Sequence, residues 1–215
     1  VTTAAAAEGL RARAAVQPTD VDAMFREFAD AGGDGAGLKD RRLTLNGFRI
    51  CMPVAAPFFE MGELVTQRLF QVLGGDSEGL GPEQFLCAVY LFTCASDEER
   101  YRLLFNMFDL HGGGFVRKKE FRAMCMAVVK GSHELPDSFD TDLKALERTM
   151  TDAGMQLYDL NKDGKLSFEE WCAYAKDDTS IMGCYEALSM GSSSELLQQL
   201  RGATPQPMGV GGLAA

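Results

Sequence analysis

The twelve residues from Asp159 to Glu170 constrain the fold of this chain more than any other part of its sequence. They place oxygen-bearing groups at the first, third, fifth, seventh, ninth and twelfth positions, which is the spacing that wraps one hard cation. These six positions are Asp159, Asn161, Asp163, Lys165 (through its backbone carbonyl), Ser167 and Glu170. Gly164 stands at the sixth position, where such a loop turns sharply. The spacing therefore predicts a metal-binding loop.

The ion that this loop fits best is Ca²⁺. Ca²⁺ takes about 6–8 oxygen ligands, and a glutamate that binds through both oxygens at the twelfth position favours it over the smaller Mg²⁺. A metal-free acidic loop is the other alternative, but it gives no reason for six matched positions. With an apolar helix before it and Trp171 after it, the segment is a helix–loop–helix of the EF-hand type, and we expect one Ca²⁺ there.

The same frame recurs three more times along the chain with fewer ligands. One copy covers Asp109–Glu120 and another covers Leu73–Gln84, while the weakest runs from Asp30 to Phe48 with an insertion around 36–41. The central apolar position is filled in turn by Leu43, Leu80, Val116 and Leu166. Because a single hand leaves apolar helix faces exposed, we expect the hands to pair through an antiparallel bridge at this position.

The three sister loops have lost ligands to different degrees. The loop 109–120 keeps Asp109, Gly114 and Glu120. His111 and Gly113 replace two oxygen ligands, and Arg117 brings a positive charge to the ninth position, so weak or absent ion binding is predicted. His111 alone is poor support for a zinc site, since no second His or Cys accompanies it.

The two N-terminal loops are predicted to bind no ion in the ordinary frame. The loop 73–84 lacks an acid at its first position and ends in Gln84. The first loop has the wrong length, and Asp30 and Asp34 could hold an ion only by another route.

The predicted fold class is all-α, with four EF-hands in two paired lobes and additional C-terminal helices. The expected segments are a flexible N-terminal stretch (1–19), an N-terminal hand pair (20–95), a C-terminal hand pair (96–178), C-terminal helices (179–201) and a flexible tail (202–215). Ser96 and Glu99 predict a capping box, and Pro82 predicts a first helical position. Apolar residues from Phe139 to Leu157 recur at helical spacing and predict one long helix face.

Composition narrows the function classes. With 21 Lys and Arg against 31 Asp and Glu, the formal net charge is −10, which argues against nucleic acid and anionic membranes as partners. No apolar run is long enough for a membrane span, and without a Met-Gly start there is no basis for predicting a myristoyl anchor. The six cysteines show no C-x-x-C spacing, which predicts buried, reduced thiols in the cytoplasm over disulfides or a metal-thiolate site. We find no nucleophile or phosphate-loop arrangement, so the prediction is that the chain is not an enzyme.

Several segments resemble one branch of the neuronal calcium sensor superfamily, the calaxin-like proteins. The resemblance is carried by the insert 29–42, by Ser96–Tyr101 leading into Leu104–Leu110, by Asp163–Phe168 and by Asp177–Ile181. It implies an axonemal protein of the cilium or flagellum that associates with the outer dynein arm and its docking complex on doublet microtubules. Such proteins carry usable ligands in the second and third hands, which this chain lacks.

Two functions follow as hypotheses. The first is a non-enzymatic, calcium-binding adaptor that presents an apolar groove to amphipathic or coiled-coil helices of docking-complex or dynein proteins. The alternative is a calcium sensor or regulatory subunit of a channel or phosphatase. The eleven methionines could line an adaptable groove or simply fill the core; examples are Met107, Met124, Met126, Met150 and Met155.

Overall fold

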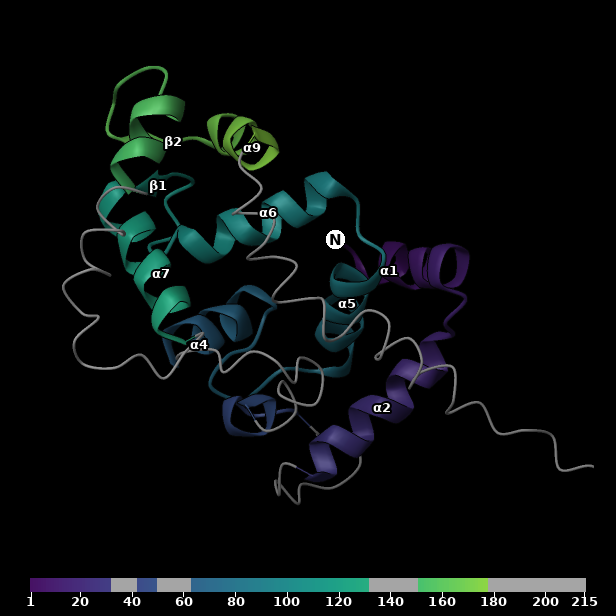
Figure 1. Cartoon of the computed structure of the whole chain (residues 1–215). Helices are drawn as coiled ribbons and strands as arrows, with labels where there is room; N and C mark the ends of the chain where they lie inside the picture. The colour runs from purple at the N-terminus through teal and green to yellow at the C-terminus, as the bar shows by residue number, and fades with distance from the viewer. Residues whose placement is uncertain (32–41, 50–62, 132–150, 178–215) are drawn as a thin grey trace, which may run out of the picture.

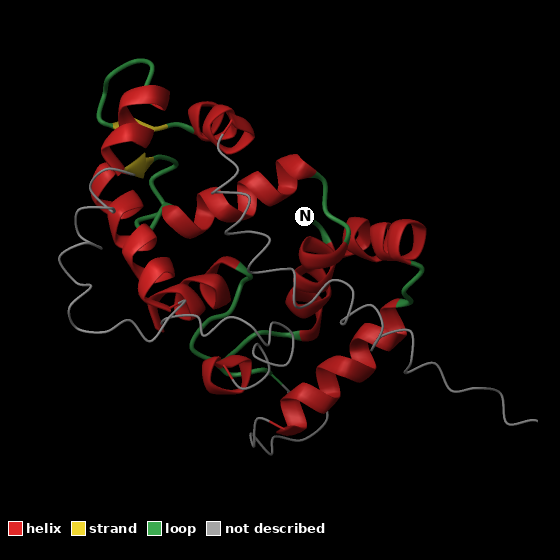
Figure 2. Cartoon of the chain, in the orientation of Figure 1, coloured by secondary structure: helices red, strands yellow, loops and turns green. Residues whose placement is uncertain are grey.

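The computed structural model describes residues 1–31, 42–49, 63–131 and 151–177. This part of the chain is all-α, as predicted, and its one regular sheet is a two-residue pairing of β1 (Val116–Arg117) with β2 (Lys165–Leu166) (Figure 2). The predicted C-terminal helices, the tail, the insert and residues 139–150 of the long helix lie outside the described residues.

The N-terminal hands pair as the sequence predicts. Their helices are α2 (Pro18–Ala31), a short helical stretch at 45–49, α4 (Glu63–Val72) and α5 (Pro82–Thr93). Leu43 and Leu80 form an antiparallel bridge in which each N–H donates to the other's carbonyl at 2.9 Å. Both side chains are buried, so the bridge lies inside the lobe.

The C-terminal hands pair in the same way. Their helices are α6 (Asp97–Phe108), α7 (Lys118–Gly131), a helical stretch at 151–158 and α9 (Phe168–Asp177). In the bridge between β1 and β2, Val116 lies opposite Leu166, and neither side chain is accessible to solvent. The prediction that the central apolar positions meet is therefore confirmed in both pairs.

The starts of α5 and α6 follow from local sequence. Pro82 opens α5, where the missing N–H costs nothing because that group has no partner inside the helix. At the start of α6, Ser96 Oγ accepts from Glu99 N–H at 3.4 Å, and the Glu99 carboxylate accepts from Ser96 N–H at 2.8 Å. The predicted capping box is present.

A ring of aromatic side chains forms the core of the C-terminal lobe around Trp171, which is fully buried. Its ring packs against those of Phe105, Phe108, Phe121 and Tyr174, with centroids 4.9–6.3 Å apart. Trp171 Nε1 donates to the carbonyl of Tyr101 at 3.1 Å, which fastens α9 to α6. Because α6 also packs against α4, α5 and α7, it joins the two lobes (Figure 1).

Residues 1–19 differ from the expectation of a flexible segment. They form α1 (Thr3–Gly9) and a π-helix η1 (Leu10–Ala14), which pack on α5. Ala6 and Leu10 are fully buried there. Gly9 permits the close approach, because a Cβ at this position would lie 2.3 Å from the Tyr90 ring. The alanine-rich start is therefore a close-packing helix face rather than a loose end.

The solvent exposure of the methionines, of Leu157 and of the cysteines tests further expectations from the sequence. Met107, Met124 and Met155 are buried, which supports the interpretation of these methionines as core residues, while Met150 lies outside the described residues. Leu157 was expected on the apolar face of its helix, but it is 66% exposed. The described cysteines were expected to be buried, but they are only partly buried: Cys87, Cys94, Cys125 and Cys172.

Candidate metal site

The candidate ligands at 159–170 lie between the helical stretch 151–158 and α9, and all six belong to the described residues. At the start of the loop, the carboxylate of Asp159 accepts from Asp163 N–H at 3.1 Å and from Gly164 N–H at 2.8 Å. The first carboxylate therefore faces the interior of the loop and fixes its bend.

The middle of the loop is ordered by its own polar side chains. Asn161 Oδ1 accepts from Asp163 N–H at 3.0 Å, and Asp163 Oδ1 accepts from Lys165 N–H at 3.1 Å. Lys165 Nζ lies 3.6 Å from Asp163 Oδ2 and 3.9 Å from the centre of the Phe115 ring. Asn161 and Asp163 thus each accept a hydrogen bond from the backbone N–H two residues further on.

Gly164 adopts the conformation that the sixth position demands. Its φ is +81°, and Gly114 at the corresponding position of the loop 109–120 has φ +77°. A Cβ at Gly164 would meet nothing within 4 Å, so the constraint is backbone conformation and not space.

Glu170 closes the loop from the first turn of α9, where it is 8% exposed. One carboxylate oxygen accepts from Leu160 N–H at 3.0 Å and the other from Ser167 N–H at 2.9 Å. Ser167 Oγ in turn accepts from Glu170 N–H at 3.2 Å, so the same pair caps the helix. Burial alone would raise the pKa of Glu170, but hydrogen bonds from Ser167, Leu160 and Asn161 outweigh it and lower the pKa.

The donor set fits a hard cation. Its groups are carboxylate, amide, carbonyl and hydroxyl oxygens, which suit Ca²⁺ and not a soft metal. Within the described part of the chain, no three Asp, Glu, His or Cys side chains converge on one point. The carboxylates of this loop are instead held by N–H groups of its own backbone, as shown for Asp159 and Glu170.

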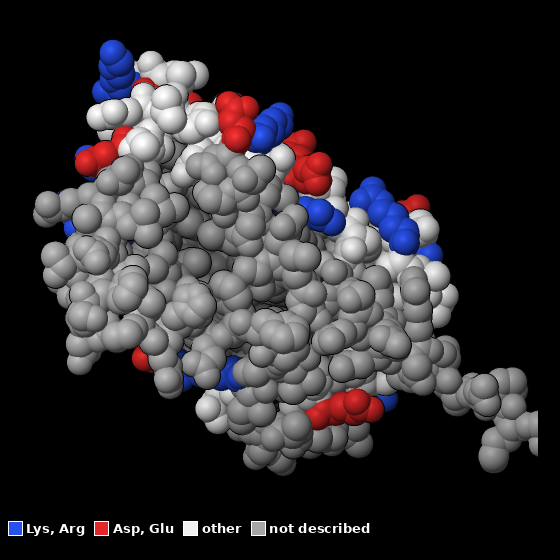
Figure 3. All heavy atoms as spheres, viewed as in Figure 1, with Lys and Arg blue, Asp and Glu red and all other residues white. Residues whose placement is uncertain are grey.

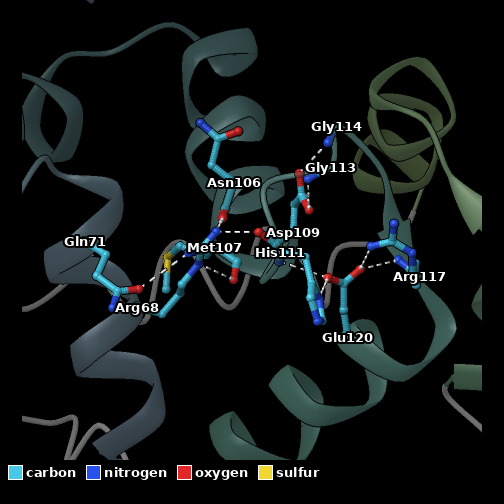
Figure 4. Close-up of polar contacts among 10 residues, drawn as sticks. All are labelled: Arg68, Gln71, Asn106, Met107, Asp109, His111, Gly113, Gly114, Arg117 and Glu120. Carbon is cyan, nitrogen blue, oxygen red and sulfur yellow. Dashed lines mark hydrogen bonds and ion pairs between the residues drawn. The ribbon is translucent and has the colours of Figure 1, made fainter.

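The loop 109–120 has the same bend but a different interior. Asp109 accepts from Gly113 N–H at 2.9 Å and from Gly114 N–H at 2.7 Å. At its end Glu120, only 2% exposed, contacts the side chains of His111 and Arg117 (Figure 4). The sequence shows the basic residue at the ninth position, but it does not show that this residue turns back onto the glutamate.

The loop 73–84 uses its acid as a turn residue. Asp76 Oδ1 accepts from the N–H groups of Glu78 and Gly79 at 2.9 and 3.1 Å, and it lies 3.4 Å from Arg42 Nη1. These contacts close a tight turn in the position where an ion-binding loop would present its ligands.

Arg68 is a polar side chain that sequence reasoning missed. From α4 it donates to the carbonyls of Asn106 at 2.6 Å, Met107 at 3.3 Å and Asp109 (Figure 4). These carbonyls belong to the C-terminal end of α6, which lacks partners of its own and carries partial negative charge. Nothing in the local pattern around Arg68 indicates a partner about forty residues away.

The length of the helices and the surface charge indicate which kinds of partner the chain can have. No helix among the described residues is both long and apolar enough to cross a membrane. On the face shown in Figure 3, acidic and basic side chains of the described residues are interspersed.

Comparison with known proteins finds calaxin among the relatives of this chain. No protein-family model matches the chain. Calaxin from Homo sapiens is 26% identical over 173 residues, which are 77% of this chain and 76% of calaxin. Calaxin from Bos taurus is 25% identical over 146 residues, 66% of this chain and 65% of the relative.

The chain is therefore similar to calaxin over most of its length, and its paired hands are those of an EF-hand protein. A calcium and calcium/calmodulin-dependent serine/threonine-protein kinase from Pisum sativum is 29% identical over 132 residues, 60% of this chain. Those residues are only 22% of the kinase, so most of the kinase has no counterpart in this chain.

Proposed function

We propose that this chain is a non-enzymatic, calcium-binding adaptor in which the loop 159–170 holds a single Ca²⁺. The observation that carries the proposal is the contrast among the loops. The loop 159–170 combines a complete oxygen donor set with Gly164 at φ +81° and a buried Glu170. The loops 73–84 and 109–120 use their acids for turns and ion pairs.

The ligands would be Asp159, Asn161, Asp163, the Lys165 carbonyl, Ser167 and Glu170. A bound Ca²⁺ supplies the positive charge that lets closely spaced carboxylates coexist. Glu170 and Ser167 also cap α9, and the next residue of α9 is Trp171 at the centre of the lobe core. A change in the position of Glu170 is therefore passed directly to the packing of α9 against α6.

The similarity to calaxin supports a place in the axoneme of the cilium or flagellum. We propose association with the outer dynein arm and its docking complex on doublet microtubules, through amphipathic or coiled-coil helices of those proteins. The degenerate N-terminal pair then has a structural and partner-binding role and binds no ion. Its hands keep the paired architecture around Leu43 and Leu80 but lack a usable ligand set.

Cell fractionation tests the location. A tagged copy expressed in ciliated cells should stay with the axoneme after detergent extraction. A diffuse or membrane-bound signal would contradict it and would favour a regulatory subunit of a phosphatase or channel.

Isothermal titration tests the adaptor role. Synthetic amphipathic helices from docking-complex and dynein proteins should bind the chain, with an affinity that differs between calcium and chelator. Glu170→Gln should remove that difference, whereas Glu169→Gln, at the exposed neighbouring residue, should keep it. Absence of binding in both conditions would rule out helical docking.

A further inference from the structure

The buried Glu120 stands at the twelfth position of the loop 109–120, where an ion-binding hand places its bidentate glutamate. Both of its oxygens contact basic side chains of the same loop. Oε1 accepts from His111 N–H at 3.0 Å and lies 2.5 Å from His111 Nδ1. Oε2 accepts from Arg117 N–H at 2.8 Å and lies 3.7 Å from Arg117 Nη1 (Figure 4).

The guanidinium of Arg117 also lies over the interior of this loop. A Cβ built on Gly113, the fifth position, would lie 3.4 Å from Arg117 Nη2 and 3.6 Å from Nη1. The side chain at the fifth position of an ion-binding hand is a ligand and points at the ion. The positive charge of Arg117 therefore occupies the side of the loop that a metal would use.

We propose that the loop 109–120 carries its own cation, with Arg117, supported by His111, taking the place of Ca²⁺ at Glu120. This hand then folds without a metal ion, and its loop binds no metal ion. This differs from a loop that has merely lost ligands, because the buried carboxylate at its twelfth position is neutralised by basic side chains of the same loop. In the loop 159–170, by contrast, the contacts of Glu170 come from loop N–H groups and the Ser167 hydroxyl.

The consequence concerns the pairing of the two hands. Arg117 belongs to β1, which pairs with β2, and Glu120 precedes Phe121 in the core around Trp171. A hand that folds without metal keeps β1 and half of this core in place when calcium is absent. Given the calcium site proposed above, the loop 159–170 then binds its ion while the paired hand, which contains the loop 109–120, is already folded.

The experiment is a double-mutant cycle in excess chelator, with Arg117→Met, Glu120→Gln and the double variant. Fluorescence of Trp171, the only tryptophan of the chain, follows the unfolding of this lobe. Because no calcium is present, the result does not depend on the calcium site at 159–170, which the Glu170→Gln titration tests separately. Lys119→Met is the matched control, since Lys119 is an exposed basic residue in α7.

We expect Arg117→Met to lower the Tm by about 2–4 °C, and Lys119→Met to lower it by less than about 1 °C. In the Glu120→Gln background, the effect of Arg117→Met should largely vanish. His111→Ala should also lower the Tm. An Arg117→Met effect that equals the Lys119→Met effect, or that is unchanged in the Glu120→Gln background, would overturn the proposal.

Discussion

Replacing Arg68 by Met should weaken the junction between the two lobes. Met keeps an apolar stem against α6 but loses the donors to the carbonyls of Asn106, Met107 and Asp109. The contacts to Met107 and Asp109 are partly buried, while the one to Asn106 is exposed and contributes little. At about 1 kcal/mol for each of these two partly buried hydrogen bonds, the variant should lose about 2 kcal/mol of unfolding free energy. For a chain of this size that is a fall in Tm of about 4–8 °C.

Thermal unfolding in chelator measures this change, followed by far-ultraviolet circular dichroism and by Trp171 fluorescence. Arg26→Met is the control, because Arg26 is exposed on α2. Arg68→Lys should recover only part of the loss, since one ammonium group cannot reach all three carbonyls as the guanidinium does. A loss below about 0.5 kcal/mol for Arg68→Met would refute the idea that these contacts hold the lobes together.

Two further predictions concern the N-terminal half and the start of α6. Burial alone would raise the pKa of Glu99, but hydrogen bonds from Ser96 and Tyr90 outweigh it and lower the pKa. The ionised carboxylate therefore contributes stability that is present at neutral pH and disappears as the pH falls through this lowered pKa. Tm measurements in chelator from about pH 7 to about pH 3 should show wild type and Glu99→Gln converging in acid; a constant difference would contradict the assignment. Gly9→Val should cost about 1–3 kcal/mol, because its Cβ would lie 2.3 Å from the Tyr90 ring, whereas Ala4→Val on the exposed side of α1 should cost little. Equal unfolding free energies for these two valine variants would show that α1 does not pack closely in solution.

The pairing of the hands could be predicted because its signal is a local pattern that repeats. Leu43, Leu80, Val116 and Leu166 occupy one position of one frame, and the structure joins them two by two. The capping box at the start of α6 could be predicted for the same reason, since its two partners are three residues apart. Spacing alone indicates the six candidate ligands, and their role as a calcium site stays a prediction.

The contacts that sequence reasoning missed join residues far apart, or depend on which way a side chain turns. Arg68 reaches carbonyl groups on another helix, and carbonyls carry no sequence signal. The packing of α1 depends on a glycine fitting over Tyr90, which no helical periodicity encodes. Arg117 was recognised as a charge in the wrong place for an ion, but its contact with Glu120 required coordinates.

Calcium titration of three proteins tests the central claim most directly. Isothermal calorimetry of the native chain, Glu169→Gln and Glu170→Gln compares variants of neighbouring carboxylates, of which Glu169 is exposed and Glu170 buried. We expect one ion per chain for the native protein and for Glu169→Gln. Glu170→Gln should lose most of the binding, because it removes the carboxylate that can bind through both oxygens. Unchanged stoichiometry and affinity in Glu170→Gln would contradict the assignment of the loop 159–170 as the calcium site.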